Sequence, residues 1–269
     1  MTIALTHVAG RVGDHNDLAM HATPLLAEVL SQRLGVAPEV LGESEPALAV
    51  NWDEELAAAT PLLQRLAERY EELFERQSTP MTVLSRCAPA LATLPVVARY
   101  RPDAVVIWFD AHADLNTPEN TTTGYLGGLA LSGPLGLWES GLGAGLAMEN
   151  AILVGTRDLD EPEQRLVDEG LVRLVPVGEG MAEELRLAVA GRPVYVHLDC
   201  DVLEPRTVPT DYLVPGGMTL DQLRACAEVL AESEVVGIEI GELEIGEDAA
   251  DTAPSLLLAS ALEPLLRAV

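Results

Sequence analysis

Short apolar runs alternate along this chain with longer stretches in which apolar residues recur at helical spacing. The short runs are typical of buried strands, because a parallel sheet is covered on both faces and its strands are bounded by turn residues. These runs predict strands at residues 2–9, 37–41, 81–84, 104–109, 151–155, 171–175, 194–198 and 235–240.

The helical stretches lie between these strands. One of them ends before Gly35, a residue suited to the left-handed conformation that closes a helix. A long amphipathic helix contains Pro61, where it is expected to kink or break. The expected helices span residues 18–34, 53–77, 88–100, 182–190, 220–231 and 254–268. The alternation predicts one α/β domain over residues 1–269, with a mostly parallel sheet of about eight strands in a three-layer αβα arrangement.

An acidic motif follows the predicted strand at 104–109. Asp110, His112 and Asp114 come next in the chain, and continued extended geometry would place their side chains on one side. Ligands of open α/β sheets bind at the carboxyl ends of the strands. The motif therefore predicts three metal-binding side chains that point into one crevice.

A second acidic motif follows the strand at 194–198. Alternation would place Asp199 and Asp201 on one face and turn Cys200 away, which favours a structural role for this cysteine. Four carboxylates and one imidazole in one crevice would repel one another unless a cation lies between them. We expect divalent metal, and oxygen-rich donors suit Mn²⁺ better than a closed structural zinc site does. The alternative is that these aspartates are solvated loop ends or helix caps.

Composition narrows the possible partners. The chain has 16 basic residues, all of them Arg, against 43 acidic residues, so its net charge is −27. This charge would repel nucleic-acid phosphates and anionic membranes, and the absence of Lys excludes Schiff-base lysine chemistry. The excess of acidic residues is explained by the solubility that a high net charge gives. A second explanation is that the negative charge attracts a cationic small-molecule substrate.

The cysteines indicate a reducing compartment. Cys87, Cys200 and Cys226 are odd in number, widely spaced and without a Cys-x-x-Cys pair, which argues against a disulfide framework and a zinc ribbon. The first residues lack the basic start and the long apolar core of a signal peptide. No apolar run of about 18 residues occurs, so a membrane-spanning helix is not expected. We therefore expect a cytoplasmic protein.

Five motifs resemble, in the right order, the signature set of the arginase (ureohydrolase) superfamily. They are Asp-Ala-His-Ala-Asp-Leu-Asn-Thr-Pro from residue 110, Gly-Thr-Arg-Asp-Leu-Asp from 155, Leu-Asp-Cys-Asp-Val-Leu-Glu-Pro from 198, Pro-Gly-Gly-Met-Thr from 215 and Gly-Ile-Glu-Ile-Gly-Glu from 237. The resemblance implies an arginase-like fold and a hydrolase that acts on C–N bonds of linear amidines. It also implies a homo-oligomer, such as a trimer or a hexamer.

The resemblance further implies a dinuclear manganese centre that activates water for attack on a guanidinium carbon. Asp110 and Asp199 would bridge both ions. Asp114 would bind the first ion as a catalytic residue, whereas His112 and Asp201 would bind the second.

Other matching positions would contact the substrate. Glu242 corresponds to the acid that accepts hydrogen bonds from the guanidinium group, and it is the second catalytic residue implied. Two further sets of residues would hold the amino-acid end of the substrate, which resembles an arginase more than an agmatinase. Asn116 and Thr123 match positions at the α-carboxylate, and Asp158, Asp160 and Glu163 match positions near the α-amino group.

Two positions depart from the family pattern. Cys87 takes the place of a histidine that binds the first ion, and a thiolate there would be a softer ligand. Gly127 takes the place of a histidine that shuttles a proton to the departing amine, a loss expected to cost on the order of 10²–10⁴ in rate on an ordinary guanidinium substrate. The alternatives are an inert buried thiol at Cys87 and a glycine chosen for backbone freedom at Gly127.

These departures favour a substrate that needs less help than L-arginine. An N-hydroxyguanidine is less basic, carries its own hydroxyl, and would fit the space expected at Gly127. The same pair of changes resembles the branch of the family that hydrolyses Nω-hydroxy-L-arginine to hydroxyurea and L-ornithine in the biosynthesis of the antibiotic D-cycloserine. The alternatives are an ordinary arginase, which makes urea and L-ornithine, and a non-catalytic arginase-fold pseudoenzyme.

Overall fold

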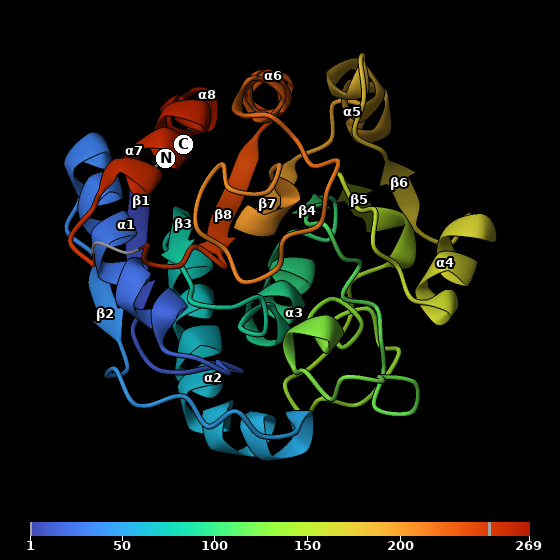
Figure 1. The fold of residues 1–269 in the computed structure, drawn as a ribbon. Coiled ribbons are helices and arrows are strands. Elements are labelled where there is room, and N and C mark those ends of the chain that lie inside the picture. The colour runs from blue at the N-terminus through green and yellow to red at the C-terminus, as the bar shows by residue number, and fades with distance from the viewer. Residues whose placement is uncertain (1, 247–248) are drawn as a thin grey trace.

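An eight-stranded parallel β-sheet forms the centre of the protein, whose computed structural model describes residues 2–246 and 249–269 (Figure 1). The strands are β1 (Thr2–Val8), β2 (Glu39–Leu41), β3 (Ser78–Val83), β4 (Val105–Phe109), β5 (Ala151–Val154), β6 (Arg173–Val175), β7 (Val194–Asp199) and β8 (Val235–Gly241). They are arranged in the order β2-β1-β3-β8-β7-β4-β5-β6, and each neighbouring pair is parallel. The predicted strands and their parallel arrangement are confirmed.

Helices cover both faces of this sheet, which confirms the three-layer αβα fold (Figure 1). One face packs against α1 (Leu18–Leu34), α5 (Met181–Val189), α6 (Leu220–Leu230), α7 (Ala253–Ala261) and α8 (Glu263–Ala268). The opposite face packs against α2 (Trp52–Glu75), α3 (Ala90–Tyr100) and α4 (Glu161–Asp168). Each interface buries an extended apolar cluster, the main favourable contribution to folding. None of these described helices is both long and apolar enough to cross a membrane.

Local sequence signals account for several helix ends. α1 ends before Gly35, which adopts a left-handed φ of 68° as predicted. Pro61 lies inside α2 without interrupting it, because the surrounding turns pack residues such as Leu63 into the core. The single helix expected at residues 254–268 is wrong in one respect, since it divides at Leu262 into α7 and α8.

The pattern of apolar residues does not predict α4. This helix has eight residues, and its apolar residues Leu166 and Val167 are adjacent and partly buried, so they are too few to show a helical period in the sequence. Its start does carry a polar signal. Asp160 and Glu163 form a capping box, in which the Glu163 side chain accepts the backbone N–H of Asp160 at 2.8 Å.

The register of the central strands brings their carboxyl ends to one level. Phe109 of β4 pairs with Leu198 of β7, and Leu198 pairs in turn with Ile240 of β8. Ile240 also pairs with Val83 of β3. The segments that follow these neighbouring strands therefore start at the same edge of the sheet. They carry both acidic motifs and Cys87.

Candidate metal centre and substrate pocket

The first acidic motif bends sharply after β4 instead of continuing as a strand. The backbone N–H of His112 donates to Oδ1 of Asp110 at 2.6 Å, and Asp114 adopts a left-handed φ of 52°. The predicted extended geometry is therefore wrong here, because Asp favours side-chain turns and tolerates the left-handed region. The turn still brings the three side chains to one cluster of candidate ligands.

The second acidic motif uses a similar turn after β7. Oδ1 of Asp199 accepts the backbone N–H of Asp201 at 2.7 Å, and Cys200–Val202 forms a short 3₁₀ helix. Asp199 and Asp201 reach the site through this turn rather than through strand alternation. Cys200 packs in the apolar core, which supports its structural interpretation.

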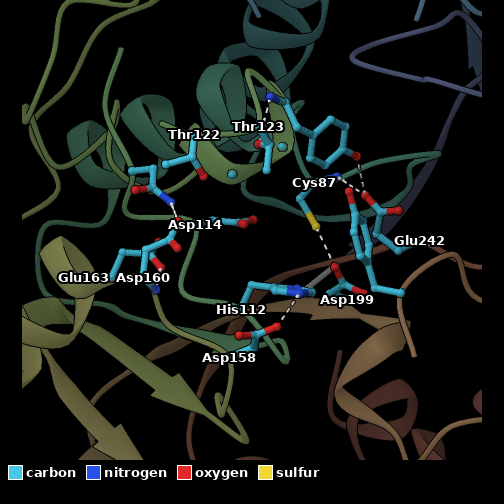
Figure 2. A pocket seen from close by; sticks show the side chains of 15 residues that line it. Cys87, His112, Asp114, Thr122, Thr123, Asp158, Asp160, Glu163, Asp199 and Glu242 are labelled. Atoms are coloured by element: carbon cyan, nitrogen blue, oxygen red, sulfur yellow. Dashed lines mark hydrogen bonds and ion pairs between the residues drawn. The ribbon is translucent and has the colours of Figure 1, made fainter. Parts of the chain in front are cut away.

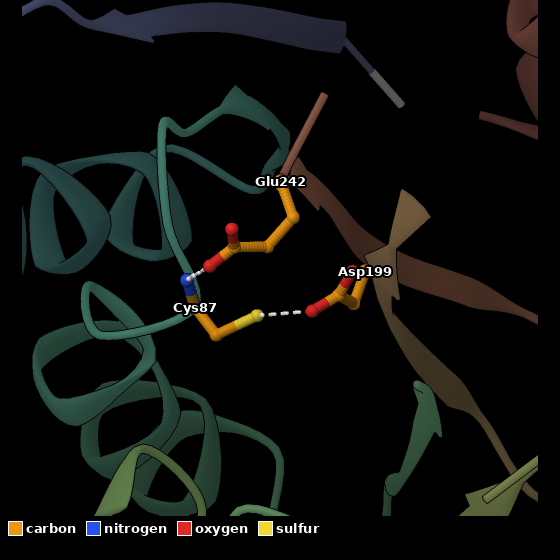
Figure 3. Close-up of side chains that lie close together, drawn as sticks. All are labelled: Cys87, Asp199 and Glu242. Carbon is orange, nitrogen blue, oxygen red and sulfur yellow. Dashed lines mark hydrogen bonds between the residues drawn. The ribbon is translucent and has the colours of Figure 1, made fainter. Parts of the chain in front are cut away.

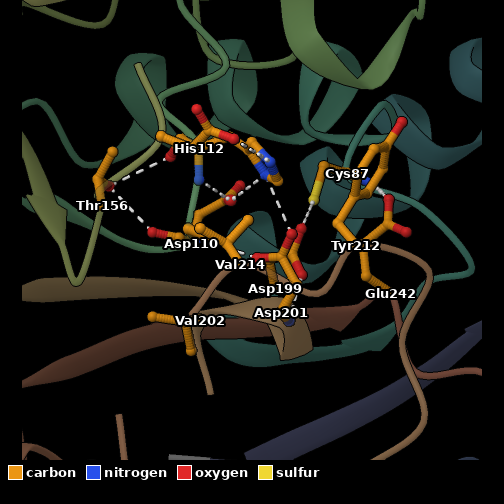
Figure 4. Close-up of polar contacts among 12 residues, drawn as sticks. Cys87, Asp110, His112, Thr156, Asp199, Asp201, Val202, Tyr212, Val214 and Glu242 are labelled. Atoms are coloured by element: carbon orange, nitrogen blue, oxygen red, sulfur yellow. Dashed lines mark hydrogen bonds and ion pairs between the residues drawn. The ribbon is translucent and has the colours of Figure 1, made fainter. Parts of the chain in front are cut away.

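Candidate ligand atoms form overlapping groups at the strand ends (Figure 4). Nδ1 of His112 lies 3.0 Å from Oδ2 of Asp201 and 3.3 Å from Oδ1 of Asp110. These three residues offer ligand atoms that all lie within 4.8 Å of one another. A second such group contains Cys87, Asp110 and Asp114. Because Asp110 belongs to both groups, its geometry fits a position between two ions.

Cys87 lies inside this cluster (Figure 3). Its sulfur is 3.2 Å from Oδ2 of Asp199, and its backbone N–H donates to Oε1 of Glu242 at 3.2 Å. These three residues form a third group of closely spaced ligand atoms. Cys87 is only 2% exposed, yet it lines the pocket into which the cluster opens. The geometry therefore favours a ligand role over an inert buried thiol.

Burial makes this cluster electrostatically unfavourable without a cation. Burial and the neighbouring Asp201 raise the pKa of Asp110 to about 6. Burial and nearby carboxylates also raise the pKa values of Asp114 and Asp199 well above their usual range. Burial would lower the pKa of His112, but its contacts with Asp110 and Asp201 raise it to about 12. A bound divalent cation would relieve the repulsion among the carboxylates.

The donors have the chemistry of a hard divalent site. Carboxylate oxygens predominate, with one imidazole and one thiol among the described groups. Oδ2 of Asp201 is buried, and the group 3.0 Å from it is Nδ1 of His112, its ion-pair partner. Both atoms are metal ligands once deprotonated, so a divalent cation can take the place of the proton that they share. The residues present therefore fit a manganese-type ion.

A buried arginine that the sequence motifs do not point to lies behind Glu242. Nη1 of Arg86 is 2.6 Å from Oε2 of Glu242, and the Arg86 side chain is fully buried. The same guanidinium lies 3.0 Å from a carboxylate oxygen of Glu244 and 3.4 Å from one of Asp14. These partners come from opposite ends of the chain, so no local spacing reveals them. The ion pair fixes the direction of the Glu242 carboxylate.

Tyr125 fills the space beside Gly127, which corrects the expectation of an open gap there. A Cβ atom at Gly127 would lie 2.4 Å from Cε1 and 2.7 Å from Cζ of the Tyr125 ring. The Tyr125 hydroxyl donates to Oε1 of Glu242 at 3.1 Å. Gly127 has no left-handed φ, so backbone freedom does not explain the glycine either. The glycine makes room for a phenol rather than for a substrate hydroxyl.

The cluster opens into a pocket of about 220 Å³ (Figure 2). This volume lies below the roughly 300–1,000 Å³ of sites for drug-sized ligands, so the pocket suits a small molecule. Within the described chain, its lining holds six acidic side chains and no arginine. An acidic lining favours a cationic occupant.

The residues implied at the amino-acid end of the substrate all line this pocket. They are Asn116, Thr123, Asp158, Asp160 and Glu163. Nδ2 of Asn116 donates to Oδ2 of Asp160 at 2.8 Å, while Oδ1 of Asn116 is buried without a partner. Both carboxylate oxygens of Glu163 accept backbone N–H groups, so this residue also holds two loops together. That second task was not foreseen from the sequence.

The chain is similar to several known proteins. The arginase family model matches residues 10–266. The Nω-hydroxy-L-arginine amidinohydrolase of Streptomyces lavendulae is 43% identical over 239 residues, which cover 89% of this chain and 88% of that protein. Arginase of Bacillus subtilis (strain 168) is 28% identical over 202 residues, 68% of each chain. A crystal structure of arginase from Bacillus subtilis, 24% identical, superposes with a TM-score of 0.85 over 99% of this chain and 98% of that one.

Gly127→Ala should destabilise the protein by about 1–3 kcal/mol, because the new methyl group overlaps the Tyr125 ring. The free energy of unfolding, measured by urea denaturation, tests this expectation. Tyr125→Ala in the same background should cancel most of the overlap, whereas additive effects of the two substitutions would show that the ring and the methyl group do not compete.

Mn²⁺ should raise the melting temperature of metal-free protein more at pH 7.5 than at pH 5. The pKa of Asp110 is raised to about 6 in the folded state, so its contribution to stability is present below about pH 3.8 and is lost as pH rises through 6. Manganese replaces the proton, and the gain is about 2.7 kcal/mol at 100 times Kd. Calorimetry at both pH values measures it, with Asp110→Asn as the control. An equal rise at both pH values would contradict the assignment.

Proposed function

Since this chain belongs to the arginase family and is a hydrolase that acts on guanidino C–N bonds, we propose that it is a manganese-dependent amidinohydrolase that converts Nω-hydroxy-L-arginine into hydroxyurea and L-ornithine. The observation that supports the hydroxylated substrate is that the described pocket lining has one histidine, His112, and that it belongs to the candidate metal cluster together with the Cys87 thiol nearby. The name of the Streptomyces lavendulae relative supports the same substrate. A trimer or hexamer, a cytoplasmic location and a place in D-cycloserine biosynthesis stay predictions.

The metal would be held by side chains at or just after the carboxyl ends of β3, β7 and β4. In this proposal, Asp110 and Asp199 would each serve as a ligand shared by two Mn²⁺ ions, as the family resemblance implies. Cys87 and Asp114 would complete the site of one ion. His112 and Asp201 would complete the site of the other, and Nδ1 of His112 lies 3.0 Å from Oδ2 of Asp201. When bound, the two ions supply a nucleophile by lowering the pKa of water to near neutrality.

Glu242 would orient the guanidino group of the substrate. Oε1 already accepts the Cys87 backbone N–H and the Tyr125 hydroxyl, and Oε2 is paired with Arg86. These three donors hold the carboxylate in one direction at the pocket wall. Its remaining lone pair, on Oε2, can accept an N–H group of a cationic amidine and so orient the carbon that is attacked.

The opposite wall of the pocket would bind the amino-acid end. Asn116 lines this wall, and the family resemblance places it at the α-carboxylate of the substrate. Asp158 and Asp160 are exposed and line the same pocket. They add negative charge on this side. The Thr123 hydroxyl is available to the α-carboxylate, as the family resemblance implies.

The lack of a free imidazole in the pocket favours a hydroxylated substrate. Among the lining residues, His112 is the one histidine, and it is committed to the proposed metal site. No other imidazole lining this part of the described chain can deliver a proton to a departing amine. An N-hydroxyguanidine is less basic than a guanidine and depends less on such help.

The kcat/KM of the protein for Nω-hydroxy-L-arginine should exceed its kcat/KM for L-arginine by a factor on the order of 10²–10⁴. Initial rates with both substrates in Mn²⁺ test this, with hydroxyurea and urea identified as products. Glu242→Gln should lower both rates, which shows that they arise in one site. Equal values or a preference for L-arginine would make the protein an ordinary arginase. No turnover together with no bound manganese would make it a pseudoenzyme.

Cys87→Ser should weaken manganese binding by about tenfold or more, since a neutral hydroxyl is a poorer ligand than a thiolate. The number of bound ions and their Kd, measured by elemental analysis and titration calorimetry, report the effect. Cys226→Ser is the matched control, because Cys226 is equally buried but lies in α6, away from the cluster. Unchanged stoichiometry and affinity in Cys87→Ser would remove this residue from the ligand set.

A further inference from the structure

A buried imidazole lies directly behind Cys87. Nε2 of His197 is 3.2 Å from the Cys87 sulfur, and Nδ1 of His197 is 2.7 Å from Oε1 of Glu239. The His197 and Glu239 side chains are both fully buried. His197 precedes Asp199 on β7, and Glu239 lies opposite it on β8. The sulfur therefore has the Asp199 carboxylate on one side and a hydrogen-bonded imidazole on another.

The His197 ring is held on its face as well as at its edge. The Trp108 ring stacks on it with centroids 3.6 Å apart and an interplanar angle of 5°. Nε1 of Trp108 donates to Oδ2 of Asp110 at 3.1 Å. The Trp108 indole thus contacts both His197, which lies behind the Cys87 sulfur, and Asp110, a proposed metal ligand. The ring cannot turn about its axis without losing the stack and the Glu239 hydrogen bond.

Glu239 is held by neutral donors on its other oxygen. Oε2 accepts the hydroxyls of Tyr195 at 2.7 Å and of Thr93 at 2.9 Å. The Tyr195 hydroxyl is in turn 2.9 Å from that of Tyr70. Over the described parts of the chain, His197 is the basic side chain within ion-pair distance of Glu239, and no arginine is. The carboxylate is therefore dedicated to one imidazole.

This arrangement is more than stability alone requires. Burying an imidazole and a carboxylate costs free energy, and an apolar pair of similar volume is often as stable. What the polar pair adds is direction. The Cα–Cβ bond of Cys87 has three staggered rotamers, and the contact with His197 favours the one that faces Asp199.

We propose that His197 and Glu239 are positioning residues that hold the Cys87 sulfur toward the metal cluster. The inference rests on the proposed function, in which Cys87 is a metal ligand. Groups behind the ligands of metal sites commonly contribute about 10–100-fold to metal affinity by fixing the orientation of the ligand. Here the supported ligand is a thiol, and its support is an imidazole that is itself oriented by a buried carboxylate.

Two isosteric substitutions separate positioning from packing. The Gln side chain places its amide nitrogen near the Nε2 position of His197 and can still reach the sulfur, whereas Asn reaches only the Nδ1 position, toward Glu239. His197→Asn should therefore weaken Co²⁺ binding about 10–100-fold and lose most of the sulfur-to-cobalt charge-transfer absorption. His197→Gln should retain both within about threefold. Tyr70→Phe, which perturbs the same buried network two links away, should leave the absorption unchanged.

The absorption distinguishes the two levels of the proposal. Wild-type protein that binds Co²⁺ without a sulfur band would remove Cys87 from the ligand set, and the proposed metal site would fail. A wild-type band that persists in His197→Asn at unchanged affinity would overturn only the positioning role. If circular dichroism shows that His197→Asn does not fold, Glu239→Gln takes its place, because an amide can present a donor to Nδ1 and release the ring. A weaker band supports the proposal and an unchanged band refutes it.

Discussion

The site depends on the crowding of like charges at one edge of the sheet. The register of β4, β7 and β8 starts two acidic motifs at the same level, and side-chain turns then draw the carboxylates together. Backbone N–H groups hold them there, including that of Ala111, which donates to Oδ1 of Asp201 at 3.0 Å. The energy of folding thus maintains a repulsion that a divalent cation can relieve, and a preformed site of this kind loses little entropy when the ion binds.

Two different cations balance the acidic side chains of the pocket. A metal ion would balance the carboxylates of the ligand cluster, whereas Glu242 is paired with the guanidinium of Arg86. Arg86 also binds Asp14, from the loop after β1, and Glu244, which follows β8. The orientation of the Glu242 carboxylate, which lines the pocket, is therefore tied to the packing of the loop after β1 and of the segment after β8. A stabilising substitution at Arg86 would therefore also remove the ion pair that orients the Glu242 carboxylate.

The sequence predicted the fold well because strands and helices differ in apolar period, and because parallel strands must place the following loops at one edge. It also predicted which acidic residues meet. It was wrong about how they meet, since Asp110 and Asp199 form turns with their own side chains instead of extending the strands. Arg86, Tyr125 and His197 escaped prediction for another reason. Their partners are distant in the chain, so only the folded structure shows that they act on Glu242 and Cys87.

The contact between Tyr125 and Gly127 limits which residues these two positions can hold together. A side chain at position 127 would overlap the Tyr125 ring as it now lies, so a histidine fits at 127 only if that ring moves or is replaced. Either change alone produces a protein with a steric conflict or a void beside Glu242. The residues at positions 125 and 127 are thus coupled, and a larger side chain at 127 requires a smaller or displaced side chain at 125.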